Sequence, residues 1–401
     1  MGIVIERLGH RGDGIAPAPE GDRYIPFTLP GEVVEETGGR PRILTSSSDR
    51  VKPRCPAFTR CGGCALQHAS DAFVARWREE IVAQALAARG IEARFAAQAI
   101  SPPRSRRRAT FSARRTKKGV QFGFHAGRGE EIVEIAACTV LHPDLLALVG
   151  PLGDLARIGG SRKGELKIAV TLTDSGADMS VTGGKPLEGA MLPELVAFCH
   201  RARLARLSWE GEVVATLTPP AVAMGRARVE PPPGAFLQAT AEGEAALVAA
   251  VATILTGGSR LLDLFAGCGT FALALSERAE VHAVEGEAPM LAALDRGWRG
   301  ASGVKRVTTE TRDLFRRPVL ASEMMGFDGA VIDPPRAGAE RQVAELAAAR
   351  LPRIAMVSCN PVTFARDAEA LIQAGYAMGA ITVVDQFRWS PHTELVAGFT
   401  L

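Results

Sequence analysis

Residues 260–271 read Arg260-Leu261-Leu262-Asp263-Leu264-Phe265-Ala266-Gly267-Cys268-Gly269-Thr270-Phe271. The apolar run predicts a buried strand, the glycine pair a tight turn, and the residues after it the start of a helix. From Ala241 onward, strand and helix patterns alternate, which is typical of βαβ units around a parallel sheet. We therefore expect an α/β fold in which residues 231–401 form a doubly wound, Rossmann-like domain.

The glycine turn indicates a nucleotide site. Gly267 and Gly269 allow a ligand to approach the backbone closely, although the third glycine of the dinucleotide fingerprint is missing. Glu285 ends the next expected strand, about 20 residues after Asp263, a spacing suited to a carboxylate that binds ribose hydroxyls. Asp313 follows a third expected strand, from which it would reach an adenine amino group. These features alone leave S-adenosylmethionine and a nicotinamide cofactor both open.

Three polar motifs lie at the ends of further apolar runs. Asp333-Pro334-Pro335-Arg336 and Ser358-Cys359-Asn360-Pro361 each end a run, and His392-Thr393-Glu394 opens the last one. Strand ends of this kind face the ligand crevice of a doubly wound sheet, so a thiol, a carboxylate and an arginine are expected to converge there. Arg336 is suited either to a phosphate or to a carboxylate partner, and the sequence does not choose.

In this order, the three motifs resemble those of the S-adenosylmethionine-dependent RNA uracil-5-methyltransferases, especially the iron-sulfur branch that acts on 23S ribosomal RNA. The resemblance covers nearly the whole chain and makes residues 231–401 a methyltransferase domain. It implies that Cys359 is the nucleophile, that Glu394 is the general base, and that Asp333 holds the uracil. The cofactor site that it implies is lined by Gln238, Phe265, Thr270, Glu285, Asp313 and Asp333. Thr240 departs from the family pattern, which commonly has asparagine at this position.

The chemistry of uracil methylation requires the same groups. Carbon 5 of uracil is too weak a nucleophile to take a methyl group from a sulfonium, so a thiolate must first add to carbon 6. Cys359 would supply this covalent activation. The methylated adduct still carries the carbon 5 proton, and Glu394 is suited to remove it as a base. The target uridine must be single-stranded or flipped out of a helix to be attacked in this way.

Four cysteines form a candidate metal site. Cys55, Cys61 and Cys64 have the spacing C-x5-C-x2-C, and Cys138 is the natural fourth ligand. Four thiolates suit either an iron-sulfur cluster or a structural zinc ion, and spacing alone does not separate the two. The resemblance favours a four-iron four-sulfur (4Fe-4S) cluster with a structural role, so zinc is the less favoured metal.

The first 230 residues are expected to contain two further parts. Short strand patterns and glycines in residues 1–50 predict a small β-barrel of the OB type, which often binds RNA or sugars, with a plain β-hairpin appendage as the alternative. Residues 51–230 are expected to form a central α+β domain that carries the metal cluster and binds RNA, with a helix over 71–89 and a linker over 219–233. Residues 101–129 contain no acid. Their basic and aromatic residues predict an RNA surface, with a plain solvated sheet face as the alternative: Arg104, Arg106, Arg107, Arg108, Phe111, Arg114, Arg115, Lys117, Lys118, Phe122, Phe124 and Arg128.

Composition sets limits on the class of protein. The chain has 401 residues, 47% hydrophobic and 23% charged, which is ordinary for a globular protein of two or three domains. The N-terminus lacks a signal-peptide core and no run of about 18 apolar residues occurs, so we expect a cytoplasmic protein without membrane contact. Its net charge of +3 is too small to predict RNA binding by itself. No obligate protein partner is evident.

The sequence therefore predicts a methyltransferase that acts on carbon 5 of a uridine in 23S ribosomal RNA. The same chemistry on a transfer RNA uridine is the nearest alternative. A non-catalytic RNA-binding or assembly protein is a second, which the presence of Cys359, Glu394 and Asp333 disfavours. An oxidoreductase with a nicotinamide cofactor is a third, which the missing glycine disfavours.

Overall fold

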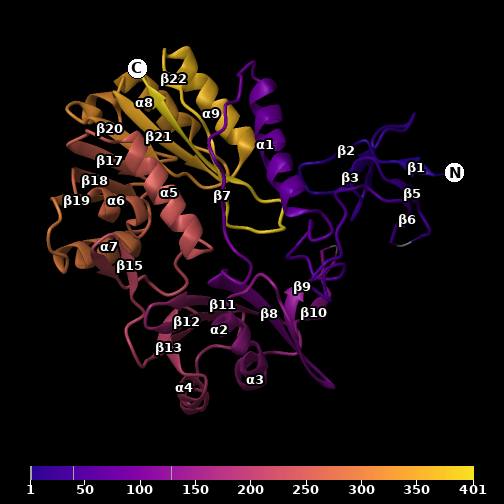
Figure 1. Cartoon of the computed structure of the whole chain (residues 1–401). Coiled ribbons are helices and arrows are strands. Elements are labelled where there is room, and N and C mark those ends of the chain that lie inside the picture. Colours follow the sequence, from indigo (N-terminus) through magenta and orange to yellow (C-terminus); the bar gives the residue numbers. More distant parts are fainter. Residues whose placement is uncertain (1, 39, 128) are drawn as a thin grey trace.

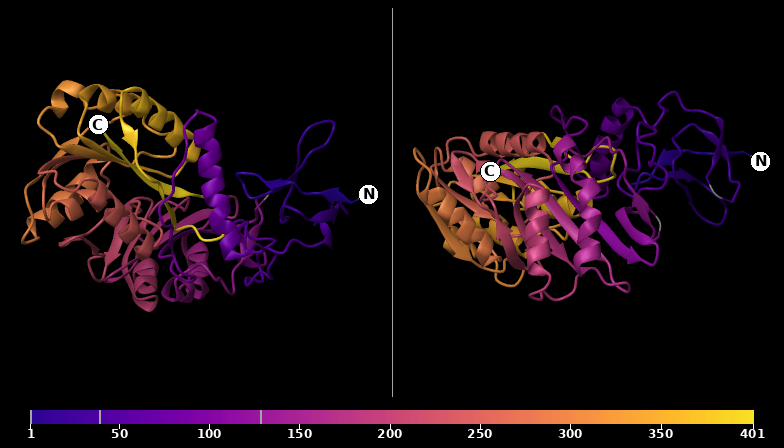
Figure 2. Two further views of the ribbon diagram at one scale, coloured as in Figure 1. Left: turned by 45° about the horizontal axis from the view of Figure 1, so that its top comes forward. Right: turned by 90° about the horizontal axis from the view of Figure 1, so that it is seen from below.

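The structure is a computed structural model that describes residues 2–38, 40–127 and 129–401. Arg128, part of the basic segment, lies outside these residues. Figures 1 and 2 show three regions: a sheet covered by helices, a second sheet that lies below it in Figure 1, and an N-terminal group of short strands beside α1 (Asp71–Ala87). None of the described helices is long and apolar enough to cross a membrane.

The largest sheet among the described residues has nine strands, in the order β19-β18-β17-β20-β21-β24-β23-β7, with β22 paired to β24. The strand numbers fall from β19 to β17 and then rise from β20, so the chain starts in the middle of the sheet and builds outward on both sides. The five strands from β17 to β21 are mutually parallel, as expected for a doubly wound sheet. The α/β prediction is confirmed. The strands are β7 (Ala99–Ile100), β17 (Arg260–Leu264), β18 (Glu280–Glu285), β19 (Val307–Thr311), β20 (Gly329–Ile332), β21 (Arg353–Ser358), β22 (Ala377–Met378), β23 (Thr382–Asp385) and β24 (Glu394–Thr400).

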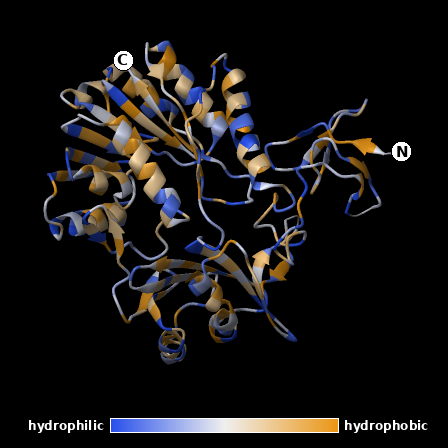
Figure 3. Cartoon of the chain, viewed as in Figure 1, coloured by the Kyte–Doolittle hydropathy of each residue, from blue (hydrophilic) through white to orange (hydrophobic). Residues whose placement is uncertain are grey.

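Hydrophobic cores cover both faces of this sheet. Alternate residues of β17 belong to different cores: Leu261 to one, and Leu262 and Leu264 to the other, as the two-residue period of a strand requires. Figure 3 shows hydrophobic residues along these strands. The covering helices are α5 (Ala241–Ile254), α6 (Thr270–Leu275), α7 (Ala288–Arg299), η1 (Ala321–Met324), α8 (Glu340–Ala349) and α9 (Pro361–Gln373).

Helix α1 joins this layer from far away in the sequence. Ser70 caps its N-terminus by accepting a hydrogen bond from the Phe73 N–H, and Gly90 with φ +71° follows its end, close to the expected bounds. Val82 and Leu86 pack into the core of the nine-stranded sheet. The buried face of this helix also includes a charged side chain, that of Arg78. The division of the chain at residues 50 and 230 stays a prediction.

The second sheet has seven strands among the described residues, in the order β10-β9-β8-β11-β12-β13-β14. Phe111 and Phe122, expected on an RNA surface, are buried, and Phe124 stacks on Phe111 at 4.9 Å between ring centroids. The aromatic part of that expectation is therefore wrong, because these rings form the core under helices. The elements are β8 (Arg108–Thr116), β9 (Gly119–His125), β10 (Ile132–Glu134), α2 (Pro143–Ala147), α3 (Val149–Gly159), β11 (Leu166–Thr173), β12 (Gly176–Thr182), α4 (Leu192–Arg201), β13 (Leu204–Trp209) and β14 (Glu212–Thr216).

The expected linker over 219–233 is instead a hairpin of β15 (Val222–Met224) and β16 (Ala227–Val229). Val222, Met224 and Val229 are buried in the core of the nine-stranded sheet. Prolines flank the hairpin, and short edge strands tolerate them there, which is why the composition imitates a linker.

Residues 2–45 form two three-stranded antiparallel sheets, β1-β5-β6 and β2-β3-β4. Their strands are β1 (Ile3–Val4), β2 (Arg7–Leu8), β3 (Gly14–Ala16), β4 (Arg23–Ile25), β5 (Val33–Glu35) and β6 (Arg42–Thr45). Ile5 and Ala16 share one buried cluster with Ile25 and Val34, so the sheets enclose a common core. Closure into an OB-like barrel stays a prediction.

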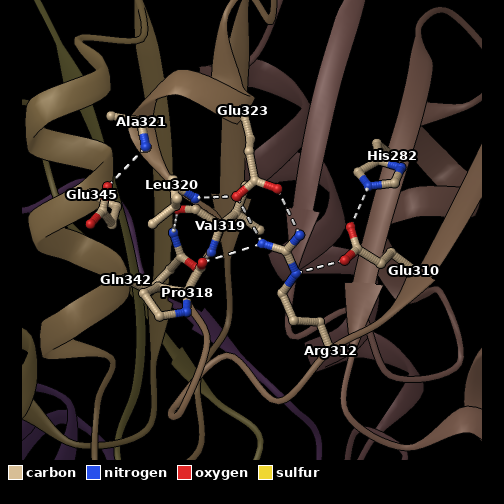
Figure 4. A network of polar contacts seen from close by, with 10 residues as sticks. All are labelled: His282, Glu310, Arg312, Pro318, Val319, Leu320, Ala321, Glu323, Gln342 and Glu345. Atoms are coloured by element: carbon tan, nitrogen blue, oxygen red, sulfur yellow. Dashed lines mark hydrogen bonds and ion pairs between the residues drawn. The ribbon is translucent and has the colours of Figure 1, made fainter.

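An ionic network holds the edge strand β19 to η1 (Figure 4). Arg312 donates to both carboxylate oxygens of Glu323, at 3.0 and 2.7 Å, and to Glu310 at 2.6 Å. The hydrogen bonds from Arg312 lower the pKa of Glu323 to about 2. Its charge therefore stabilises the folded state above the ordinary pKa of 4.5, and this contribution is lost as the pH falls toward 2.

We expect Glu323→Gln to lower the free energy of unfolding by about 1 kcal/mol at pH 7, since the pair is bidentate but partly exposed. The difference from the parent should shrink below pH 4 and vanish near pH 2. Urea unfolding across this pH range measures it. The control is Glu212→Gln at an exposed carboxylate that has no ion-pair partner among the described residues. A pH-independent difference would contradict the assignment.

Candidate active site

The predicted nucleophile and base come from adjacent strands. Cys359 follows β21 directly, and Glu394 is the first residue of β24. These strands are antiparallel, with Ser358 opposite Leu395, so the end of β21 meets the start of β24. Asp333 follows β20, the other neighbour of β21, and its N–H donates to the Leu264 carbonyl. The fold thus gathers three groups that lie far apart in the sequence.

Low solvation shifts the ionisation of all three groups. Burial raises the pKa of Asp333 to about 7. Burial, followed by the charge of Asp333, raises the pKa of Glu394 to about 8. The Cys359 thiol, half-buried, has its pKa raised to about 11 by burial and by the charges of Glu394 and Asp333. Without ligands, burial therefore favours the protonated forms of all three groups, whereas a bound cation would favour the ionised forms.

Arg336 is the cation that faces this thiol. Its charge lowers the pKa of Cys359 against the dominant effect of burial. Its side chain is exposed and makes no ion pair with a carboxylate of the described residues, so both alternatives left by the sequence, a phosphate and a carboxylate partner, stay predictions. Asn360 fixes the loop around it by donating from Nδ2 to the Arg336 carbonyl at 3.0 Å, and caps α9 by accepting from the Val362 N–H at 3.1 Å.

The glycine turn lies beside Asp333 at the switch point of the sheet. Glu285 accepts from the Gly267 N–H at 3.0 Å and from the Glu287 N–H at 3.0 Å. Gly267 has φ +56° and open space where a side chain would stand, whereas a Cβ on Gly269 would lie 2.7 Å from Leu294. One glycine therefore borders free space and the other allows close helix packing.

Asp263 is a member of the site that sequence reasoning missed. Its Oδ2 accepts from the Ala272 N–H at 2.8 Å, while Oδ1 is buried with no hydrogen-bond partner among the described residues. Burial, then the charges of Asp333 and Glu285, raises its pKa to about 8. A carboxylate within the apolar run Leu261–Leu264 was the available signal. The unpaired oxygen and three acids with raised pKa values fit a cationic cofactor.

The other predicted cofactor residues are distributed around this turn. Phe265, at φ +65°, packs on Phe315 at 5.3 Å, and Thr270 begins α6. Asp313 is exposed and accepts from the Phe315 N–H at 3.0 Å, so it supports this ring. Gln238 is buried across from them and contacts Gln386, a residue that the sequence did not single out.

A buried arginine holds the loop that leads to Glu394. Arg78 of α1 is fully buried and pairs with Asp385 at 2.9 Å. It also donates to backbone carbonyls of the loop, those of Phe387, Ser390 and His392. Sequence reasoning placed α1 in a core but found no signal for this contact, because nothing in an amphipathic pattern pairs residues 300 positions apart.

The four candidate metal ligands approach one another. Gly62 lets the loop lie against β9, since its N–H donates to His125 O at 2.9 Å and a Cβ would be 3.0 Å from Gly127. Burial raises the pKa values of three of the thiols, and the negative charge of Cys138 raises each of them further: Cys55, Cys61 and Cys64. Within the described ranges, however, no three such side chains are close enough to hold one metal ion.

Two arginines of the basic segment lie over aromatic rings of two loops. The guanidinium of Arg106 lies 5.6 Å from the Phe387 ring centroid, and that of Arg108 lies 4.7 Å from Phe236. Phe236 is exposed. The basic segment thus extends from the seven-stranded sheet to Phe387, in the loop that leads to Glu394, and to Phe236.

Comparison with known proteins identifies the family. A family model described as tRNA (Uracil-5-)-methyltransferase matches residues 300–400, which contain all three strand-end motifs. The chain is 32% identical over 409 residues to the 23S rRNA (uracil(1939)-C(5))-methyltransferase RlmD of Edwardsiella ictaluri, covering 97% of this chain and 93% of that protein. The chain belongs to the RNA uracil-C5 methyltransferases. It is thus an S-adenosylmethionine-dependent enzyme.

Other relatives of this RNA uracil-C5 methyltransferase agree over its full length. It is 44% identical over 403 residues to an uncharacterized RNA methyltransferase of Brucella suis, covering 99% of this chain and 97% of that one. The crystal structure of the Pyrococcus abyssi tRNA (uracil-54, C5)-methyltransferase in complex with S-adenosyl-L-homocysteine matches with a TM-score of 0.76. That structure is 22% identical, covers 100% of both chains, and supports the fold.

Proposed function

We propose that this enzyme methylates carbon 5 of a uridine in 23S ribosomal RNA through a covalent adduct between Cys359 and carbon 6 of the base. The observation that carries the mechanism is the register of β21 and β24, which brings Cys359 beside Glu394, with Asp333 on the neighbouring strand end. These three residues together supply the thiol, the base and the acid that anchors the uracil.

The cofactor would occupy the glycine turn. Glu285 would bind the ribose, Asp313 and Phe265 the adenine, and Thr270 and Gln238 the remaining face. Asp263, with its unpaired oxygen, is added to this set. S-adenosylmethionine supplies an electrophilic methyl group on a positively charged sulfonium. That positive charge would favour the ionised forms of Asp333 and Glu394, whose pKa values are raised in the free protein.

The protein residues then act in sequence. The Cys359 thiol would give its proton to solvent, and the thiolate would then add its electron pair to carbon 6 while the ring electrons move toward the carbonyl at carbon 4 to give an enolate. Asp333 would hold the ring so that the enolate carbon faces the methyl group that the bound cofactor would supply. Glu394 removes the proton from carbon 5, and the electrons of that bond expel the Cys359 thiolate and restore the ring double bond.

The four cysteines would hold a 4Fe-4S cluster. Tetrahedral zinc with bonds of about 2.3 Å draws its four sulfurs close together, whereas a cluster spaces them more widely. The charges of these thiols act on one another, so they lie in one region, and the resemblance to the iron-sulfur branch favours the cluster over zinc. Its role would be structural, joining the loop at 55–64 to the sheet that carries Arg106.

The relative named RlmD supports ribosomal RNA as the substrate, whereas the Pyrococcus structure and the family description name transfer RNA. Incubation of the purified protein with tritiated S-adenosylmethionine and unmodified 23S ribosomal or transfer RNA separates these substrates. We expect label in 5-methyluridine from the ribosomal RNA pool. Label from transfer RNA alone would contradict the substrate, and label in another nucleoside would contradict the chemistry.

A further inference from the structure

Gln386 lies between the predicted base and the cofactor loop. It follows β23, is 1% exposed, and uses both ends of its amide. Its Oε1 accepts from the Ala239 N–H at 2.9 Å, and its Nε2 donates to Gln238 Oε1 at 2.7 Å and to Glu394 Oε2 at 3.0 Å. One side chain therefore contacts the base and two consecutive residues of the loop 238–239.

The orientation of this amide is determined by its partners. The backbone N–H of Ala239 can only donate, so it requires the oxygen of Gln386 on its side. The NH₂ group must then face Gln238 and Glu394. Because Gln238 accepts this bond through its own oxygen, its NH₂ group is turned away from Gln386 and has no partner among the residues described. That NH₂ group is left for a ligand.

The hydrogen bond from the Gln386 NH₂ group to Glu394 lies among titratable and charged groups. Asp333 and Cys359 are the titratable groups beside Glu394, and both become negative when they ionise. On the side of the cofactor loop, Arg107 donates to the Gln238 carbonyl and is neutralised by Glu244. Gln386 is the hydrogen-bond donor that reaches the Glu394 carboxylate, and its bond opposes the rise in the pKa of that group.

We propose that Gln386 is a positioning residue that joins cofactor binding to proton removal: one amide both points the NH₂ group of Gln238 toward the cofactor and positions the Glu394 carboxylate by donating a hydrogen bond to it. This inference rests on the proposed function, because it takes Glu394 as the base. Packing alone would be the simpler role, since a Cβ on Gly243 of α5 would lie 2.6 Å from Gln386 Cβ.

The test compares Gln386→Met, which keeps the length of the side chain but removes its polar atoms, with Gln342→Met. Gln342 is a matched control, since it is equally buried and uses its amide on the backbone of Val319, away from the site. Gln386→Glu is a second variant that keeps polarity and places another acid beside Glu394.

Two measurements are made on each purified full-length protein. For Gln386→Met we expect the midpoint of the acidic limb of the kcat–pH profile to rise by about one pH unit. At pH values below that limb, kcat should therefore fall about tenfold. We expect about tenfold weaker binding of S-adenosylhomocysteine by calorimetry, from the loss of Gln238 orientation. Gln386→Glu should move the limb further, and Gln342→Met should move neither quantity.

The outcomes separate the inference from the function beneath it. A parent enzyme that labels no uridine overturns the proposed function and this inference with it. An active parent whose Gln386→Met variant keeps the parental profile and affinity overturns the positioning role alone. Equal changes in Gln342→Met would do the same, because they would trace the effect to general loosening of the fold.

Discussion

Replacement of Cys359 by alanine is expected to abolish methyl transfer while leaving the protein folded. The side chain is half-buried at the end of β21, where the smaller residue leaves strand pairing intact. Without the sulfur, carbon 5 of uracil has no covalent activation, and the loss should exceed about a thousandfold, down to the detection limit.

Single-turnover reactions with tritiated S-adenosylmethionine and the RNA substrate measure this loss. Thermal unfolding and binding of S-adenosylhomocysteine report whether the fold and the cofactor site persist. Cys199→Ala is the control, because Cys199 is a buried thiol of α4, in the core of the seven-stranded sheet and outside the proposed site. Residual turnover of Cys359→Ala above about a tenth of the parental rate would exclude the covalent mechanism.

Replacement of Glu394 by glutamine is expected to stop the reaction one step later. Addition of Cys359 and methyl transfer do not need the base, but the methylated adduct keeps its carbon 5 proton and cannot eliminate. The amide oxygen of the new side chain can still accept from Gln386, so the local packing should persist. Protein and RNA should therefore remain covalently joined.

A denaturing gel detects this product as an RNA band shifted by the mass of the protein, dependent on S-adenosylmethionine. The double variant Cys359→Ala/Glu394→Gln should give no such band, which assigns the bond to Cys359. If Glu394→Gln instead turned over at the parental rate, another group would have to remove the proton, and the role given to Glu394 would be wrong.

The strands and the turn were predictable because their signals are local. Alternation of strand and helix patterns gave the α/β class, and the glycine pair at 267 and 269 located the turn at the switch point of the sheet. The motifs around Asp333 and Cys359 each follow the end of a parallel strand, and such ends share one edge of a doubly wound sheet. Their convergence therefore followed from the class of fold. Glu394 begins β24 and reaches the same edge because β24 runs antiparallel to β21.

The features that the sequence did not predict depend on contacts between residues far apart in the chain, or on residue types that are common in any protein. Gln386 and Arg78 are common polar residues, and their roles appear only when loops and helices from other regions lie against them. Phe111 and Phe122 were misinterpreted because an aromatic residue among arginines has the same composition in an RNA surface and in a core. Proline content likewise did not separate a buried edge hairpin from a linker.

The contact between Arg78 and the catalytic loop constrains how the enzyme is made. Arg78 binds the carbonyl of His392, 314 residues later in the chain, and β7 pairs with β23 from the same distant region. Synthesis runs from α1 toward this loop, so Arg78 has no partner in the loop until residues 385–392 have been made. A nascent chain that stops short of residue 385 therefore carries the Arg78 side chain without the carboxylate and carbonyls that hold it when buried. The site around Glu394 thus assembles only after two segments made far apart in time have come together.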